Sequence, residues 1–519
     1  MTTAPPRSNP PARRPNILLI TSDQQHFSTL GFANPHIKTP ALDRLAREGT
    51  NFTRAYCTNP TCTPSRASII TGLYPAWHHA WSIGCQLPHD VPTVGAHLAA
   101  QGYDTTLVGK AHFQPLRNGP GTDSVERQPL VRDLDFWRTF EDSHCPWYGF
   151  QHVETCRNHG DESHVGGHYA IWMEERGLKN WRDYFLEPNA EGYGAKPCKE
   201  GAWALPPEHH YTTWTAERTI AHLDRCAAGD QPFFLWSSFH DPHPPYLVPE
   251  PWASMYDPAD MPIGQLQPGE LETMCPYVAE TQKEKPDFSA WKDEGGQGNH
   301  GLHRHHPDPD KLRKHMAIYY GMTSFMGQQI GRILDKLDEL GIADNTLVVF
   351  TTDHGHFLGQ HGLVAKAFMY DDNTRLPFLA RFPGRIAAGG QCSALQSLVD
   401  LAPTFLQAAG APVPGLMQGV NQLPVWEGQL QHARTDLIVE HRHQPTKYTV
   451  RSYVNQRYKL NVYRGHDFGE LFDLQEDPGE IRNRWSDPAY ADVKHRLMFD
   501  FLQAEMNREP TRQPRVAGA

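Results

Sequence analysis

Short apolar runs alternate along this chain with segments of helical periodicity, and this alternation constrains the fold more than any other feature. The run NILLITSD is followed by the helical pattern PALDRLAREG, and NTLVVFTTD follows a long amphipathic pattern at residues 308–341. Apolar runs of this kind are typical of strands that helices bury on both faces. We therefore predict an α/β fold, in which a large, mainly parallel or mixed sheet is sandwiched by helices.

The pattern also divides the chain. Residues 1–13 are rich in Pro and Arg, and we expect a disordered tail there. Residues 14–425 carry the alternation and should form the main domain, with two loop-like segments inserted at about 114–207 and 262–309. Residues 426–519 contain short strand-like segments and a final helical pattern, so we expect a small C-terminal α+β subdomain with an antiparallel sheet.

Charge and cysteine content narrow the partners and the compartment. The chain has 48 Lys and Arg against 59 Asp and Glu, which argues against nucleic acid or an anionic membrane as a partner. Its nine cysteines are odd in number and scattered, which is typical of a reducing compartment. The N-terminal residues lack the apolar segment of a secretory signal. We therefore expect a cytoplasmic protein, with a homo-oligomer as an open alternative to a monomer.

Four predicted strands end in polar residues that can take part in chemistry. In open α/β sheets, ligands bind outside the carboxyl ends of the strands, so the shared position of these residues predicts one cleft. Each end alone would more often be a helix cap or a surface turn. The four ends are Ser22-Asp23-Gln24-Gln25, Gly109-Lys110-Ala111-His112, His240-Asp241-Pro242-His243 and Asp353-His354-Gly355-His356.

The residue types in this cleft fall into two groups. Asp23, Asp353 and His354, with the side-chain oxygen of Gln24, would make an oxygen-rich site with one imidazole. Such a site suits a divalent ion such as calcium or manganese better than structural zinc. A second group offers cations and proton donors that suit a tetrahedral anion. Its members are Arg66, Lys110, His112, His243 and Lys366.

A single cysteine, Cys62, stands in NPTCTPSRASIITG where a helical pattern begins. A lone cysteine is more often a buried structural residue. A helix N-terminus, however, attracts anions and can activate a nucleophile. Beside the predicted cleft, this position favours a chemical role for Cys62.

The stretch CTPSRASIITG resembles the Cys-x-Pro-Ser-Arg motif of type I, formylglycine-dependent sulfatases in the alkaline phosphatase superfamily. The blocks PNILLITSDQ, VGKAH, DPHPPY, TTDHGHFLGQHGLVAK and ELFDLQEDPGEIRN are similar to further blocks of this family, in the family's order and through nearly the whole chain. Bacterial arylsulfatases and phosphonate monoester hydrolases are the members that the chain resembles. The resemblance implies an alkaline phosphatase-like fold with residues 14–425 as the catalytic domain.

The resemblance also implies a mechanism. A separate maturation enzyme would oxidise Cys62 to formylglycine (3-oxoalanine), whose hydrate attacks the sulfur of a small-molecule sulfate ester. The attack would expel the alcohol and leave a covalent sulfate on residue 62. The second hydroxyl of the hydrate would then lose its proton, re-form the aldehyde and release sulfate. One divalent metal ion would be bound by Asp23, Gln24, Asp353, His354 and the oxygen of modified residue 62.

The remaining roles are implied by the same motifs. Arg66 would hold the hydrate, and Lys110 and His112 would lie beside it, with His112 as the base. His243 and Lys366 would bind sulfate and the leaving oxygen. Two further histidines would line the pocket or contact the residues that line it. They are His240 and His356.

Two departures from the family pattern leave the substrate open. Many relatives have Asp-Asp where this chain has Asp23-Gln24, and Asn where it has His354. At both points the chain is similar to bacterial phosphonate monoester hydrolases and to some bacterial sulfatases. The pair Lys110 and His112, in contrast, resembles the Lys-x-His pair of sulfatases. We therefore predict sulfate ester hydrolysis by an arylsulfatase-like enzyme, with phosphonate monoesters or phosphodiesters as the alternative substrates. A non-catalytic anion-binding protein is a third reading, which the set of cations beside a metal site disfavours.

Overall fold

A computed structural model of the chain provides the fold. The predicted tail, Cys198 and parts of both predicted insertions lie outside the residues that the structure describes. The described residues are 14–117, 119, 121–157, 165–185, 200–291, 308–442 and 447–510.

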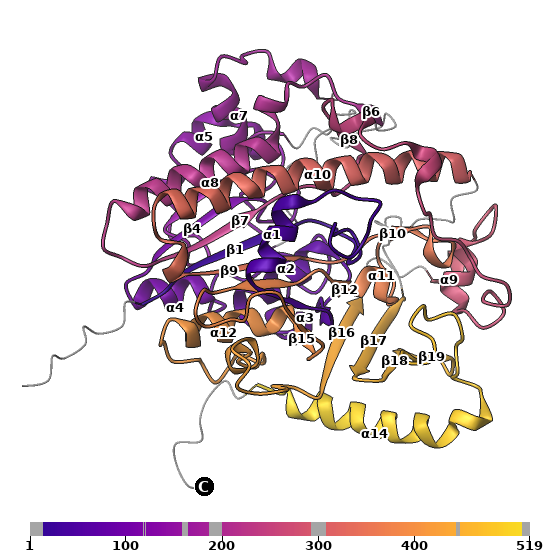
Figure 1. Cartoon of the computed structure of the whole chain (residues 1–519). Helices are drawn as coiled ribbons and strands as arrows, with labels where there is room; N and C mark the ends of the chain where they lie inside the picture. Colours follow the sequence, from indigo (N-terminus) through magenta and orange to yellow (C-terminus); the bar gives the residue numbers. More distant parts are fainter. Residues whose placement is uncertain are drawn as a thin grey trace, which may run out of the picture.

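An eight-stranded mixed sheet forms the centre of the molecule (Figure 1). Its strand order is β14-β2-β13-β9-β1-β7-β4-β5, where β14 is Gly390–Cys392 and β2 is Thr50–Phe52. Strand β1 pairs in parallel with both β9 and β7, and β7 pairs in parallel with β4. The antiparallel strand β13 makes the sheet mixed. The central strands are β1 (Asn16–Ser22), β4 (Asp104–Gly109), β7 (Phe233–Ser238), β9 (Thr346–Thr352) and β13 (Leu379–Arg381).

Helices cover both faces of this sheet, which confirms the predicted α/β sandwich. Successive side chains of a strand point to opposite faces, so β1 alone contributes to two cores. Leu18 and Ile20 pack with residues of α1 (Pro40–Glu48), α8 (Tyr211–Ala227) and α10 (Pro309–Glu339). These helices lie above the sheet in Figure 1, and α4 (Val94–Ala100) and α12 (Leu401–Ala408) lie below it.

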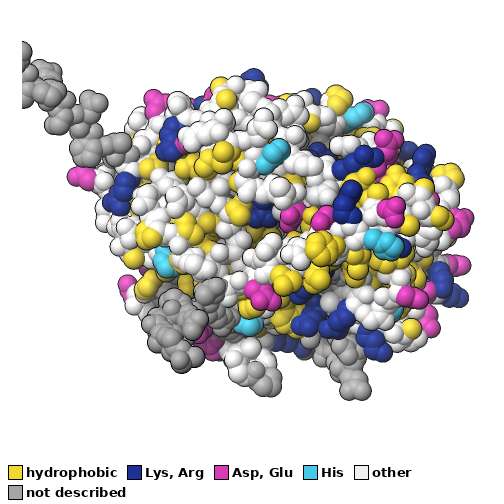
Figure 2. All heavy atoms as spheres, turned by 90° about the horizontal axis from the view of Figure 1, so that it is seen from below, with side chains coloured by type: hydrophobic (Ala, Val, Ile, Leu, Met, Phe, Trp, Pro, Cys, Tyr) yellow, Lys and Arg dark blue, Asp and Glu magenta, His cyan; other side chains and the backbone are white. Residues whose placement is uncertain are grey.

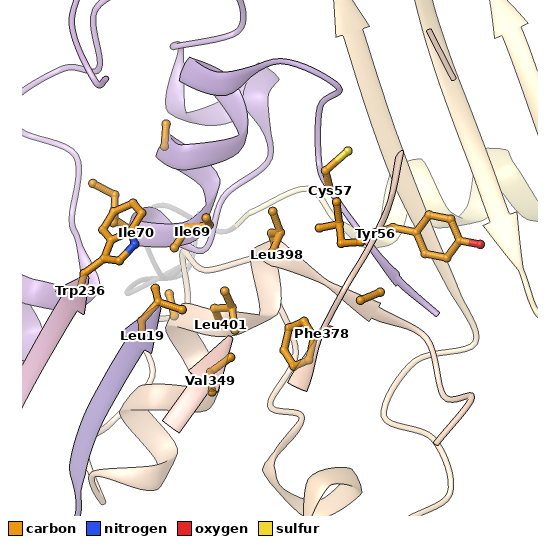
Figure 3. Packing of buried hydrophobic residues seen from close by; sticks show 14 of the residues in the cluster. Leu19, Tyr56, Cys57, Ile69, Ile70, Trp236, Val349, Phe378, Leu398 and Leu401 are labelled. Atoms are coloured by element: carbon orange, nitrogen blue, oxygen red, sulfur yellow. The ribbon is translucent and has the colours of Figure 1, made fainter. Parts of the chain in front are cut away.

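The second core fixes the helix that begins at Cys62. Helix α2 (Cys62–Thr71) is buried along its whole length. Its Ile69 and Ile70 pack with Leu19 of β1 and Trp236 of β7 (Figure 3). Because both strands belong to the rigid centre of the sheet, this packing holds the start of α2 against the strand ends.

Part of the segment predicted as a first insertion belongs to the main sheet. It contains β5 (His152–Thr155), which pairs in parallel with β4 and forms one edge of the main sheet. The strand has only four residues, and its side chains alternate between half-buried and buried, so its sequence carries little strand signal. Four large aromatic residues of this segment are buried. They are Trp137, Trp147, Tyr148 and Tyr169.

A four-stranded antiparallel sheet and a final helix confirm the predicted C-terminal subdomain. The helix α14 (Ala491–Asn507) packs against this sheet. Lys459 of the sheet is buried and ion-pairs with Asp371, at 2.5 Å, and with Glu480, at 2.7 Å. The strands are β16 (Asp436–Arg442), β17 (Thr449–Asn455), β18 (Tyr458–Tyr463) and β19 (Gly469–Asp473).

The outer side of α14 faces solvent. Figure 2 shows this side of the molecule, where hydrophobic side chains lie among charged ones. Among the described residues, no helix combines the length and the apolar character that crossing a membrane requires. The large apolar side chains that α14 exposes are Met498, Phe499, Leu502 and Met506.

Candidate active site

The ends of strands β1 and β9 meet the first residue of α2. Asp23 follows β1, and Asp353 and His354 follow β9; all three are fully buried. The Sγ atom of Cys62 lies 3.7 Å from Oδ1 of Asp23 and 3.1 Å from Nε2 of His354. The structure therefore brings these four predicted residues together, although they come from three separate parts of the chain.

Hydrogen bonds from α2 hold this arrangement. Ser65 donates its hydroxyl to the backbone oxygen of Asp353, at 2.6 Å. Arg66 is fully buried and donates Nε to Oδ2 of Asp353, at 2.8 Å. Its Nη1 donates to the backbone oxygen of Lys110 and to Oγ of Ser238, at 2.9 and 2.8 Å. Arg66 thus joins α2 to three strand ends.

The residues around Cys62 fit a divalent cation. One ligand atom each from Asp23, Cys62, Asp353 and His354 lie within 4.8 Å of one another. The side-chain oxygen Oε1 of Gln24 is buried and has no hydrogen-bond partner among the described residues, so it offers one more oxygen. Two carboxylates, an amide oxygen and one imidazole make a set that suits calcium or manganese.

Three cations keep the carboxylate of Asp23 ionised. Burial alone would raise the pKa of Asp23, but the charges of Lys110, Arg66 and Lys366 more than offset it and hold the pKa well below its usual range. The ammonium of Lys110 contacts Oδ2 of Asp23 directly. Removal of one of these cations would therefore leave buried negative charge uncompensated.

The same cations act on residue 62. Burial and the charge of Asp23 raise the pKa of the Cys62 thiol, but Lys110 and Lys366 outweigh them, so the pKa falls below its usual value. Nζ of Lys366 lies 3.2 Å from Sγ, and Nζ of Lys110 lies 3.9 Å from it. Any anion formed at residue 62 is thus stabilised by two ammonium groups.

His243 completes this side of the site through Lys366. Its Nδ1 donates to the backbone oxygen of Pro244, at 2.5 Å. Its Nε2 then accepts from Nζ of Lys366, which lies 3.1 Å away. His240 lies apart from these contacts and bonds through Nε2 to the backbone oxygen of Cys156, at 2.9 Å.

Sequence reasoning missed Arg157, which contacts the predicted base. Its Nη2 lies 3.0 Å from Nε2 of His112, and its Nη1 donates to the backbone oxygen of Gln114, at 2.7 Å. A guanidinium only donates, so Nε2 of His112 accepts and the ring proton lies on Nδ1. Burial and then the charge of Arg157 lower the pKa of His112 well below its usual value. The only sequence feature that could have indicated Arg157 was its position just after the end of β5, because ligands bind at the carboxyl ends of such strands.

Comparison with known proteins gives the family of the chain. The sequence matches the family described as Sulfatase over residues 15–411, and one described as N-sulphoglucosamine sulphohydrolase, C-terminal, over residues 359–507. An arylsulfatase of Clostridium perfringens is 27% identical over 510 residues, which cover 96% of this chain and 94% of that protein. The multifunctional alkaline phosphatase superfamily protein PehA of Trinickia caryophylli is 28% identical over an alignment of 542 positions, which covers 95% of each chain. The structure of a phosphonate monoester hydrolase of Silicibacter pomeroyi superposes with a TM-score of 0.76 at 25% identity, over 96% of both chains.

Proposed function

The chain belongs to the sulfatase family, and on this premise we propose that it hydrolyses small-molecule sulfate monoesters through a hydrated formylglycine at position 62 and a covalent sulfate on that residue. The predicted family and its class, the sulfuric ester hydrolases, are confirmed. The observation that carries the proposal is the position of Cys62. Its sulfur lies close both to the ligand atoms of Asp23 and His354 and to the ammonium of Lys366.

A divalent ion, calcium or manganese, would be held by the atoms gathered at this point. It would supply the positive charge that lowers the pKa of a hydroxyl at residue 62 and stabilises the oxygens of the sulfate. The residues that would hold it are Asp23, Gln24, Asp353, His354 and modified residue 62.

The side chains around residue 62 have separate tasks in this proposal. Arg66 and Lys110 fix the strand ends and so orient the hydrate. The ammonium of Lys366 can bind a sulfate oxygen and pass a proton to the leaving alcohol. His243, which accepts from Lys366, holds the ammonium at the place where sulfate and the leaving oxygen would bind. His112 would take a proton from the second hydroxyl so that sulfate leaves. Arg157 occupies Nε2 of His112, so this step requires the guanidinium to turn away.

Burial of α2 bears on how residue 62 is modified. Cys62 is 1% exposed, and every residue of α2 is buried. A maturation enzyme that reads Cys62, Pro64, Ser65 and Arg66 must therefore act before the chain has folded. The other partner in this proposal is the small sulfate ester, and neither nucleic acid nor membrane is involved.

Phosphonate monoesters and phosphodiesters are the second candidate substrates. Gln24 and His354 support them, as does the likeness to a phosphonate monoester hydrolase. Lys110 and His112 support sulfate: Nζ of Lys110 lies 3.9 Å from Sγ of Cys62, and the charges of Lys110 and Lys366 act on His112.

The two candidates are separated by kcat/KM on a single matured preparation. We expect a higher value for an aryl sulfate monoester than for an aryl phosphonate monoester or a phosphodiester, with Cys62→Ala protein as the control for contaminating hydrolases. The reverse order would make the second candidate the function.

A further inference from the structure

The backbone of Gln24 is fixed in an unusual conformation beside the candidate metal site. Its φ of 59° lies in the left-handed region, which side chains other than glycine adopt rarely. Its amide nitrogen donates to Oδ1 of Asp353, at 3.0 Å, and its carbonyl oxygen accepts from the hydroxyl of Tyr319, at 2.8 Å. These bonds hold the backbone from which the side chain extends, and Gln24 is only 1% exposed.

The carboxamide of Gln24 has a defined partner on one side only. Its Nε2 lies 2.7 Å from Nδ1 of His356, whereas its Oε1 is buried without a hydrogen-bond partner among the described residues. An amide nitrogen cannot bind a cation, so the carboxamide is useful to a metal ion in this orientation alone. What fixes the orientation is therefore as important as the residue itself.

His356 can fix it through contacts of both ring nitrogens. Nδ1 must accept from Nε2 of Gln24, which places the ring proton on Nε2, and there it is donated to the hydroxyl of Tyr246, 3.0 Å away. The ring of Tyr319 stacks on the imidazole, with centroids 4.8 Å apart and planes at 19°. His356 is fully buried, so neither the plane of its ring nor its contacts can adapt freely.

If the hydrogen bonds of His356 ran in the opposite direction, Gln24 could not bind the metal ion. If Tyr246 donated to Nε2, the ring proton would lie on Nδ1 and would be donated to Oε1 of Gln24. The amide would then be turned, and its NH2 group would point toward the cation. The position of one proton on His356 thus decides whether residue 24 presents an acceptor or a donor to the ion.

We propose that His356 is a positioning residue, which orients the Gln24 carboxamide so that Oε1 faces the divalent ion, with Tyr246 holding the required tautomer. This inference rests on the metal site of the proposed function. It also gives a reason for the pairing of the two residues: a carboxylate at position 24 has two equivalent oxygens and needs no such orientation, but a carboxamide does.

A double-mutant cycle on matured protein tests the proposal. The dissociation constants of Mn²⁺ and Ca²⁺ are measured by chelator competition for wild type, His356→Phe, Gln24→Glu and the double variant. Phenylalanine keeps the stack on Tyr319 but removes Nδ1. We expect His356→Phe to weaken binding by about 10- to 100-fold when residue 24 is Gln, the range found when groups that orient metal ligands are removed. When residue 24 is Glu, the same change should have little effect.

Equal weakening in both backgrounds would show that His356 acts through packing alone and would overturn the proposal, as would unchanged affinity in His356→Phe. Tyr246→Phe is a milder second variant that removes only the hydroxyl, and it should weaken binding to Gln24 protein by a smaller factor. No change in Tyr246→Phe would overturn the role of Tyr246. If wild type binds neither ion, the metal site of the proposed function fails as well, so the two failures are distinguishable.

Discussion

The ammonium nitrogen of Lys366 lies 3.2 Å from the sulfur of Cys62. The same nitrogen is 3.1 Å from Nε2 of His243, so Lys366 bridges the nucleophile position and a second proton-carrying group. Both Lys366 and Cys62 are buried, which strengthens the charge interaction between them. The contact defines the side of the site at which sulfate and the leaving oxygen are expected.

Substitution of Lys366 should therefore slow catalysis. Lys366→Met keeps the length of the side chain but removes the charge and the proton, and we expect kcat for an aryl sulfate to fall by about 10²- to 10⁴-fold, the usual contribution of a positioned proton donor. Lys366→Arg should retain more activity. A Lys366→Met variant with wild-type kcat would remove this residue from the mechanism.

Asp353→Asn should abolish metal binding. Asp353 accepts from Arg66, Gln24 and His354 as well as facing the candidate metal site, and Asn keeps its shape without its charge. We expect metal content well below one ion per chain by elemental analysis, almost no activity, and an intact fold by circular dichroism. Asp241→Asn is the matched control: this buried carboxyl bonds to Tyr211 and Thr212 and lies outside the ligand cluster, so the variant should keep its metal.

The pH dependence should report on the contact between Arg157 and His112. A base works only when it is unprotonated, so a lowered pKa keeps it active to lower pH. Arg157 is, after burial, the main cause that lowers the pKa of His112. Arg157→Leu should raise this pKa and move the acid limb of the kcat profile to higher pH, whereas Arg157→Lys should move it less. An acid limb that does not move would show that His112 is not the base.

His361 should make stability depend on pH on the alkaline side. Burial lowers its pKa, but Asp372 and Glu270 more than offset this and raise the pKa to about 9. A group whose pKa is raised on folding contributes its full stability below the unfolded value, near 6.5, and loses it as the pH rises through the folded value. The difference in unfolding free energy between wild type and His361→Gln should therefore shrink between neutral pH and pH above about 9. A constant difference in urea unfolding across this range would contradict the ion-pair assignment.

The parts of the site that could be predicted from the sequence are those carried by local patterns. Asp23 and Asp353 each end a seven-residue buried strand, and such strands stand out as continuous apolar runs. Cys62 stands at the start of α2 within a motif that is itself local. These residues meet because parallel strands direct their carboxyl ends to one edge of the sheet.

The remaining contacts depend on pairings across long stretches of sequence. Arg157 reaches His112 only because β5 adds to the edge of the sheet, and four residues are too few to show a strand pattern. His356 bonds to Gln24 and Tyr246, from which it is separated by 332 and 110 residues. A histidine that orients a ligand has the same local sequence as one that binds it, so only the folded structure separates the two.

The state of residue 62 in active protein tests the central claim most directly. An unmodified thiol could attack sulfur but would have no internal route to release sulfate, so Cys62→Ala should be folded and inactive, and Cys62→Ser should release sulfate very slowly. Peptide mass spectrometry of an active preparation reads the residue itself. The tryptic peptide AYCTNPTCTPSR also contains Cys57, which is buried and serves as an internal control that should stay a thiol. We predict that this peptide carries formylglycine at position 62, in proportion to turnover across preparations. Full turnover by protein in which the peptide shows only unmodified Cys62 would contradict the account.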